Sequence, residues 1–85
     1  MPAYVYILFS ETTGKTYTGS TDNVLRRLEE HNRGKTRSTI SGIPWKLWHV
    51  FEYTNIAEAR TMEKYFKNGA GRRKLKMVLN KTPRP

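Results

Sequence analysis

Residues 3–9, Ala-Tyr-Val-Tyr-Ile-Leu-Phe, limit the fold of this chain more than any other stretch. β-Branched and aromatic residues dominate them, and apolar side chains occupy both alternating faces, which predicts a β-strand covered on both sides. The stretch is too short for a transmembrane helix, which needs about 18 or more apolar residues. It also lacks the basic leader of a signal peptide. The chain therefore needs a sheet with packing on both faces of this strand.

The chain has 85 residues and no cysteine. This length predicts one domain, residues 1–85, and excludes a two-domain enzyme with its site in an interdomain cleft. The lack of cysteine excludes a disulfide framework, a thiolate zinc site and a cysteine nucleophile. We therefore expect one soluble, cytoplasmic domain.

Turn residues, caps and helical spacing predict the other elements. Thr21 or Asp22 is the expected N-cap of the first helix, and Asn55–Glu58 resembles a capping box at the start of the second. Residues 68–71, Asn-Gly-Ala-Gly, should break the chain before a third helix. The expected strands cover residues 3–9, 15–19 and 45–53, and the expected helices cover about 23–32, 56–67 and 72–79.

The order strand, strand, helix, strand, helix, helix implies an α+β fold. We expect a small antiparallel three-stranded sheet flanked by helices, with the first two strands paired as a hairpin. Alternation along the third strand would place five side chains on one face, namely Trp45, Leu47, His49, Phe51 and Tyr53.

Positive charge is concentrated near the C-terminus. Residues 1–59 hold 7 Lys or Arg and 6 Asp or Glu, whereas residues 60–85 hold 9 bases and one acid, Glu63. This imbalance favours a polyanionic partner, nucleic acid before an anionic membrane surface. A basic surface that serves only solubility is the alternative. We expect no membrane partner, because the last helix lacks the aromatic apolar face of an interfacial anchor.

Glu63 is the most informative single residue. On a helical wheel of residues 56–67 it falls in the middle of the apolar face. Burial of an unpartnered carboxylate costs on the order of several kcal/mol. Glu63 should therefore contact a bound cation or an arginine, with Arg27 or Arg60 as the candidates.

Two tyrosines and two basic side chains can form a second group. Tyr6 and Tyr17 lie on paired strands, where neighbours on one face have Cβ atoms about 5 Å apart. A strand tyrosine taken alone is more often packing than chemistry. Arg27 and His31 are four residues apart and so share one side of their helix. Gly19, close to Tyr17, indicates a close approach of the backbone to another group.

Three segments resemble the GIY-YIG nuclease superfamily: residues 4–6 (Tyr-Val-Tyr), 17–19 (Tyr-Thr-Gly) and 23–31 (Asn-Val-Leu-Arg-Arg-Leu-Glu-Glu-His). The stretch 59–72 also resembles the small stand-alone group of the UPF0213 and excinuclease-subunit-C type. The resemblance covers nearly the whole chain and implies a GIY-YIG-like fold. A tyrosine replaces the first glycine of the pattern, and valine and threonine replace its two isoleucines.

The resemblance implies a DNA endonuclease that hydrolyses phosphodiester bonds with one divalent cation, Mg²⁺ or Mn²⁺, in DNA repair or recombination. It implies that Glu63 binds the metal, that Arg27 neutralises the scissile phosphate and that Tyr17 is the general base. His31 would assist Tyr17, and Tyr6 would hold the attacking water or position the phosphate.

The family pattern and the distribution of positive charge add further candidate site residues. Gly19 matches the second motif's glycine, and Asn80 is the candidate for an asparagine near the C-terminus. DNA is the expected partner, with RNA left open, and a protein partner would supply targeting, since phosphate contacts carry little sequence information. A nucleic-acid-binding module with this fold and no activity is the alternative. The residues expected to contact phosphates are Lys35, Arg37, Arg72, Arg73, Lys74 and Lys76.

Overall fold

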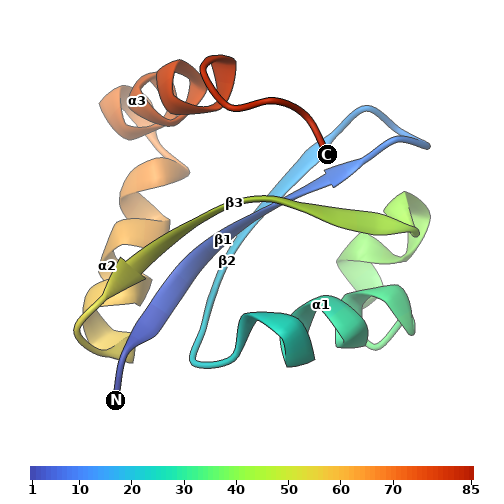
Figure 1. The fold of residues 1–85 in the computed structure, drawn as a ribbon, viewed down its shortest axis with the longest axis horizontal. Coiled ribbons are helices and arrows are strands. Elements are labelled where there is room, and N and C mark those ends of the chain that lie inside the picture. The colour runs from blue at the N-terminus through green and yellow to red at the C-terminus, as the bar shows by residue number, and fades with distance from the viewer.

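A computed structural model describes residues 1–85 (Figure 1). In chain order its elements are β1 (Ala3–Ser10), β2 (Thr16–Thr21), α1 (Val24–Asn32), the 3-10 helix η1 (Arg37–Gly42), β3 (Trp45–Tyr53), α2 (Ile56–Phe66) and α3 (Gly69–Asn80). The strands form one antiparallel sheet in the order β2-β1-β3. The expected α+β fold is confirmed. None of the helices is both long and apolar enough to span a bilayer.

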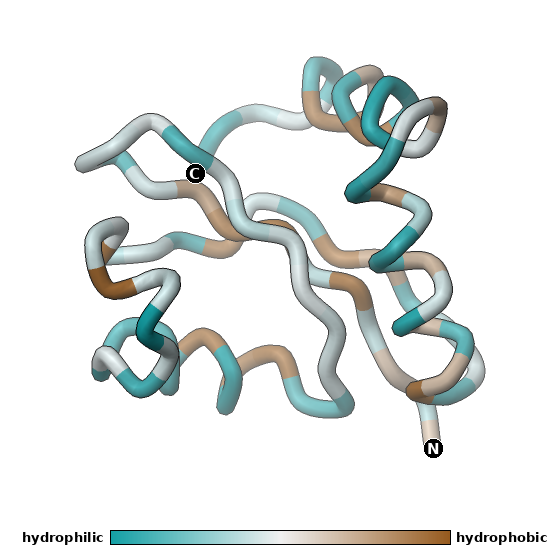
Figure 2. Tube along the Cα trace, turned by 180° about the vertical axis from the view of Figure 1, so that it is seen from behind, coloured by the Kyte–Doolittle hydropathy of each residue, from teal (hydrophilic) through white to brown (hydrophobic).

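The central strand β1 is covered on both faces. Val5 and Ile7 pack with α2 and α3, whereas Tyr6 and Leu8 pack toward α1, and none of the four is more than 1% exposed. Figure 1 shows α2 and α3 on one side of the sheet and α1 with η1 on the other. In Figure 2 the hydrophobic colour marks stretches of the strands and also parts of the helices beside the sheet. The apolar residues on both faces of residues 3–9 therefore connect two separate cores.

The strand β3 contains a bulge that its sequence does not reveal. Ile7 pairs with His49, but Leu8 pairs with Leu47, so Trp48 is an extra residue in the ladder. An extra residue moves the side chains beyond it to the opposite face. Trp45 and Leu47, before the bulge, pack toward α1, whereas Phe51 and Tyr53, after it, pack toward α2 and α3. The expectation that Trp45, Leu47, His49, Phe51 and Tyr53 share one face is wrong.

Side-chain caps define where α1 and α2 begin. Asn23, rather than Thr21 or Asp22, caps α1, because its side-chain oxygen accepts a first-turn backbone N–H at 3.0 Å. Thr21 instead accepts the backbone N–H of Asn23 at 3.1 Å and shapes the preceding turn. At α2 the expected cap is confirmed, with Asn55 accepting the backbone N–H of Glu58 at 2.9 Å.

The helix α3 begins at Gly69 rather than at residue 72. Gly69 has a φ of +40°, which a glycine adopts most easily. Gly71 lies against the end of α2, where a Cβ would be 2.5 Å from the carbonyl carbon of Tyr65. The glycine-rich stretch therefore does not delay α3, because it lets that helix start close against α2.

Candidate active site

Strand pairing and α1 bring three aromatic rings together. The register pairs Tyr6 with Gly19 and Leu8 with Tyr17, so the two tyrosines lie diagonally on the face toward α1. Their ring centroids are 6.3 Å apart. The ring of His31 is 5.9 Å from Tyr6 and 4.9 Å from Tyr17. The expected grouping of the two tyrosines with His31 is present in the structure.

Gly19 makes room for the Tyr6 side chain. A Cβ at Gly19 would lie 2.6 Å from Cζ of Tyr6 and 3.1 Å from Cε2 of Tyr17. Real Cβ atoms do not approach a ring carbon to 2.6 Å, so a larger residue would displace the phenol. The glycine therefore determines where the Tyr6 hydroxyl lies.

A chain of hydrogen bonds orients His31. The Thr39 hydroxyl donates to the carbonyl of Thr36 at 3.1 Å, so it accepts from the Nδ1–H of His31 at 2.9 Å. The opposite nitrogen, Nε2, then accepts a hydrogen bond from the Tyr6 hydroxyl, at 3.0 Å. His31 is fully buried, and this chain satisfies both of its nitrogens.

Burial keeps both partners of this pair uncharged. It raises the pKa of Tyr6 to about 12, although hydrogen bonding with Arg27 opposes the rise. Burial lowers the pKa of His31, and the nearby charge of Arg27 lowers it further. At neutral pH the pair is therefore a phenol that donates to a neutral imidazole.

Arg27 lies beside the Tyr6 hydroxyl and forms an ion pair with Glu30. Its Nη1 is 2.9 Å from Oε1 of Glu30, and its side chain is 30% exposed. Hydrogen bonding with Glu30 raises the pKa of Arg27, and hydrogen bonding with Tyr6 adds to the rise. Glu30 holds one end of the guanidinium, and the side chain remains partly exposed to solvent.

Glu63 reaches the site from α2, and its partners differ from those expected. Ser20 donates its hydroxyl to Oε1 at 2.5 Å, and the ammonium of Lys67 contacts Oε2 at 2.6 Å. Neither Arg27 nor Arg60, the two expected partners, forms an ion pair with Glu63. Burial acts to raise the pKa of Glu63, but the hydrogen bonds from Lys67 and Ser20 outweigh it and hold the pKa below its usual range.

The donor atoms around Glu63 fit a hard divalent cation that keeps most of its water. No group of three or more His, Cys, Asp or Glu side chains gathers anywhere in the chain. Mg²⁺ often binds through one or two carboxylates, with water and substrate phosphates completing its shell. Glu63, at 22% side-chain exposure, can supply that one carboxylate.

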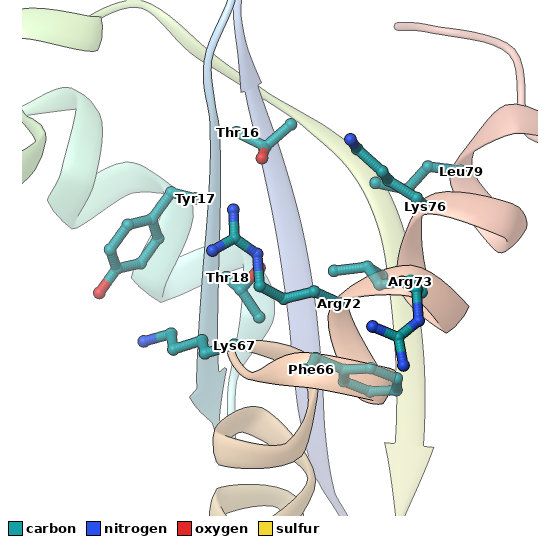
Figure 3. A pocket seen from close by; sticks show the side chains of 11 residues that line it. Thr16, Tyr17, Thr18, Phe66, Lys67, Arg72, Arg73, Lys76 and Leu79 are labelled. Carbon is teal, nitrogen blue, oxygen red and sulfur yellow. The ribbon is translucent and has the colours of Figure 1, made fainter.

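A basic groove of about 640 Å³ opens next to this cluster, between β2 and α3 (Figure 3). Tyr17 and Lys67 line it at one end, together with three of the bases expected to contact phosphates, Arg72, Arg73 and Lys76. In Figure 3 the Lys67 and Arg72 side chains reach toward β2, whereas Arg73 points away from it. The groove therefore combines positive charge with a candidate catalytic phenol.

The structure does not bring every candidate residue to this groove. Lys74 is exposed on α3 but does not line the groove. Lys35 and Arg37 are exposed near η1, on the α1 side of the sheet. Asn80 is the exposed last residue of α3 and does not line the groove.

Sequence reasoning missed four residues that position the site, Ser20, Glu30, Thr39 and Lys67. Two of them carried a local signal. Glu30 is three residues after Arg27, and Lys67 is four residues after Glu63, spacings at which helical side chains meet. Ser20 and Thr39 contact partners distant in sequence, and only the folded chain reveals those contacts.

Comparisons with known proteins identify the family of this chain. The family model of the GIY-YIG catalytic domain matches residues 2–76. A UPF0213 protein of Streptococcus agalactiae is 37% identical over 79 residues, covering 92% of this chain and 89% of the relative. A UPF0213 protein of Syntrophus aciditrophicus is 38% identical over 78 residues, covering 88% of this chain and 87% of the relative.

A solved structure has the same fold. The solution NMR structure of a UPF0213 protein from Bacillus halodurans superposes with a TM-score of 0.54 at 34% identity, covering 92% of this chain and 83% of that one. The matched family model spans both tyrosine motifs, the α1 pair and Glu63. The chain belongs to the GIY-YIG family of nuclease-type domains, in its UPF0213 group.

Proposed function

We propose that this chain is a metal-dependent DNA endonuclease that hydrolyses phosphodiester bonds. The supporting observation is that Tyr6, Tyr17, Arg27 and His31 form one cluster, and that Tyr17 and Lys67, the partner of Glu63, also line a groove rich in bases. A phosphate that reaches from the groove to this cluster would meet the Tyr17 phenol, with the Glu63 carboxylate and the Arg27 guanidinium nearby. Hydrolysis of a phosphodiester requires charge neutralisation and a positioned water, which these groups can provide.

The surroundings of each residue support its role. Arg27 offers a fork of N–H donors to two phosphate oxygens. Tyr6 donates a hydrogen bond to His31, so its oxygen can only accept, from Arg27 and from the attacking water. Tyr17, acting as a phenolate, takes the proton of that water while the water oxygen bonds to phosphorus. The leaving sugar oxygen takes a proton from solvent as its bond to phosphorus breaks. A divalent cation at Glu63 would neutralise phosphate charge and favour the ionised form of a nearby phenol.

A cleavage panel tests this proposal. Supercoiled, branched and single-stranded DNA, and RNA, are incubated with the protein in Mn²⁺, in Mg²⁺ and in chelator. We expect cleavage that chelator abolishes and that Glu63→Ala or Arg27→Ala lowers by at least about 100-fold. Circular dichroism shows whether each variant keeps its fold. Full activity in either folded variant would refute the assigned roles.

A second candidate is a nucleic-acid-binding module that does not cleave. The observation that favours it is that Lys67 already neutralises Glu63. This candidate predicts binding to the same substrates with no cleavage under any metal condition. Under either candidate, a role in DNA repair or recombination and a targeting partner protein are part of the proposal.

A further inference from the structure

Lys67 lies at the junction of the candidate metal site and the basic groove. It follows the last residue of α2, and its ammonium contacts Oε2 of Glu63 at 2.6 Å. The same ammonium lies 5.6 Å from the centre of the Tyr17 ring. The Lys67 side chain is 44% exposed and lines the groove beside Arg72 (Figure 3).

Both oxygens of Glu63 are engaged when no divalent cation is bound. Oε1 accepts from Ser20, a neutral hydroxyl on β2, and Oε2 carries the Lys67 ammonium. A hard cation can share a carboxylate with a hydroxyl donor, because that donor brings no net charge. It cannot take Oε2 while an ammonium sits on that oxygen, since two positive charges in contact repel strongly at a partly buried site.

We infer that Lys67 is an exchangeable counter-ion of Glu63, one that occupies Oε2 until a divalent cation replaces it. The inference rests on the proposed function, because it assumes that Glu63 takes a cation. Once released, the flexible lysine stem can place its ammonium in the groove, next to the bases that would contact phosphates. Metal binding at Glu63 and phosphate binding in the groove then favour each other through one side chain.

The chain contains a matched control for this exchange. Lys64 is on the same helix, one residue after Glu63, but its side chain is exposed and forms no ion pair. Lys64→Gln and Lys67→Gln remove the same charge near Glu63. Only the second removes a group that occupies Oε2.

Mn²⁺ affinity without nucleic acid tests the inference, measured by electron paramagnetic resonance of the free ion. We expect Lys67→Gln to bind Mn²⁺ about 3- to 10-fold more tightly than the wild type, because the ammonium that occupies Oε2 is gone. Lys64→Gln should change the affinity by less than about twofold, since its charge is exposed to water. Equal affinities for the two variants, or weaker binding by Lys67→Gln, would overturn the exchange.

Glu63→Gln separates this failure from failure of the proposed function. If it abolishes Mn²⁺ binding while Lys67→Gln has no effect, the metal site stands and only the exchange is wrong. If the wild type binds no Mn²⁺, or Glu63→Gln binds it as well as the wild type, the metal site itself is wrong and the exchange is refuted with it. Circular dichroism of all variants establishes that the fold is intact.

Discussion

Gly19, the smallest residue of the site, determines where the Tyr6 side chain lies. Gly19 lies directly opposite Tyr6 in the β1–β2 ladder, and the phenol fills the space that a side chain would need. The position of the Tyr6 hydroxyl, and with it the contact to His31, depends on the lack of a side chain at Gly19. A glycine in a short motif is here a requirement of packing as well as of the backbone.

Gly19→Ala should therefore damage the site more than a typical surface change would. The added methyl must push the Tyr6 ring aside, at a cost of about 1–3 kcal/mol in the free energy of unfolding. Urea denaturation measures this cost, and we expect DNA cleavage to fall with it. Adding Tyr6→Phe, which removes the hydroxyl nearest to the new methyl, should recover part of the stability but none of the activity. If the double variant is no more stable than Gly19→Ala, the clash is not the cause.

His31 should make the stability of the fold depend on pH. Burial and the charge of Arg27 lower its pKa in the folded state, and the charge of Glu30 opposes this shift. The rings of Tyr6 and Tyr17 pack against the imidazole. The unfolded chain takes up the His31 proton near pH 6.5, before the folded chain does. Stability is then complete above about pH 6.5 and is lost as pH falls through the folded pKa.

Urea midpoints between pH 5 and 8 check this expectation. The wild type should lose stability toward acid faster than His31→Gln, because that variant has no proton to take up at this position. The difference between the two curves removes the contribution of all other titrating groups. Parallel curves for the two proteins would contradict the assignment.

Some of the site residues could be predicted from the sequence and some of their contacts could not. The helical wheel placed Glu63 on the inward face of α2, and the structure confirms this direction through its contact with Ser20 on β2. A wheel does not tell which strand lies opposite, so it suggested Arg27 or Arg60 where Lys67 is the partner. Contacts across elements require the packing of the whole chain.

At the scale of elements, the two glycines that start α3 differ in function. Gly69 has a positive φ but open space around its Cα, whereas Gly71 is pressed against the carbonyl group of Tyr65. The first permits a turn and the second permits contact between two helices. Composition alone marks both as helix breakers, and for this reason the sequence predicted a later start of α3.

Alanine substitutions should distinguish these two functions. Gly69→Ala should cost about 1 kcal/mol, the usual strain of a left-handed residue. Gly71→Ala should cost more than about 2 kcal/mol, because its methyl meets the backbone of α2, which cannot move without separating the helices. Thermal denaturation of both variants measures the difference. A smaller cost at Gly71 than at Gly69 would show that α2 and α3 are not packed in this way.

The faces of β3 were the least predictable feature of the elements. The strand's limits, Trp45–Tyr53, were predicted correctly, because a proline precedes it and its residues favour strands. The bulge at Trp48 then reverses the alternation midway. A bulge is decided by the partner strand and the cores on either side, and the sequence of one strand does not contain that information.

At the scale of the whole molecule, the basic residues are of two kinds, those paired with an acid and those without an acidic partner. Arg33 and Lys46 pair with Glu29 and Glu11, whereas Arg72 and Lys76 line the groove without an acidic partner. Bases already paired with acids release few counterions when a polyanion binds. The groove bases should therefore provide most of the nucleic-acid affinity.

Two double variants with equal net charge test this distribution. Arg72→Gln with Lys76→Gln should weaken DNA binding and lower the slope of log K against log salt by about 1.5 to 2, the value for two lost phosphate contacts. Arg33→Gln with Lys46→Gln should leave that slope nearly unchanged. Fluorescence anisotropy with a labelled duplex between low and high salt gives both slopes. If the two variants behave alike, net charge rather than the groove governs binding.

The overall architecture was predictable because the sequence signals agreed with one another. A strand apolar on both faces requires two packing layers, and the order of the elements provides them on opposite sides. The antiparallel arrangement then follows from the hairpin. What the order of elements could not predict is which side chains meet at the edge of the sheet.

That edge limits how this molecule can associate. Tyr17 and Ser20 belong to β2, which pairs only with β1, and Lys67 and Glu63 approach β2 from α2 while His31 approaches from α1. A fourth strand added to β2 would lie between these two groups. An assembly of copies through continuous sheets would therefore occupy the space where the two halves of the site meet, so β-strand addition at β2 would block the proposed active site.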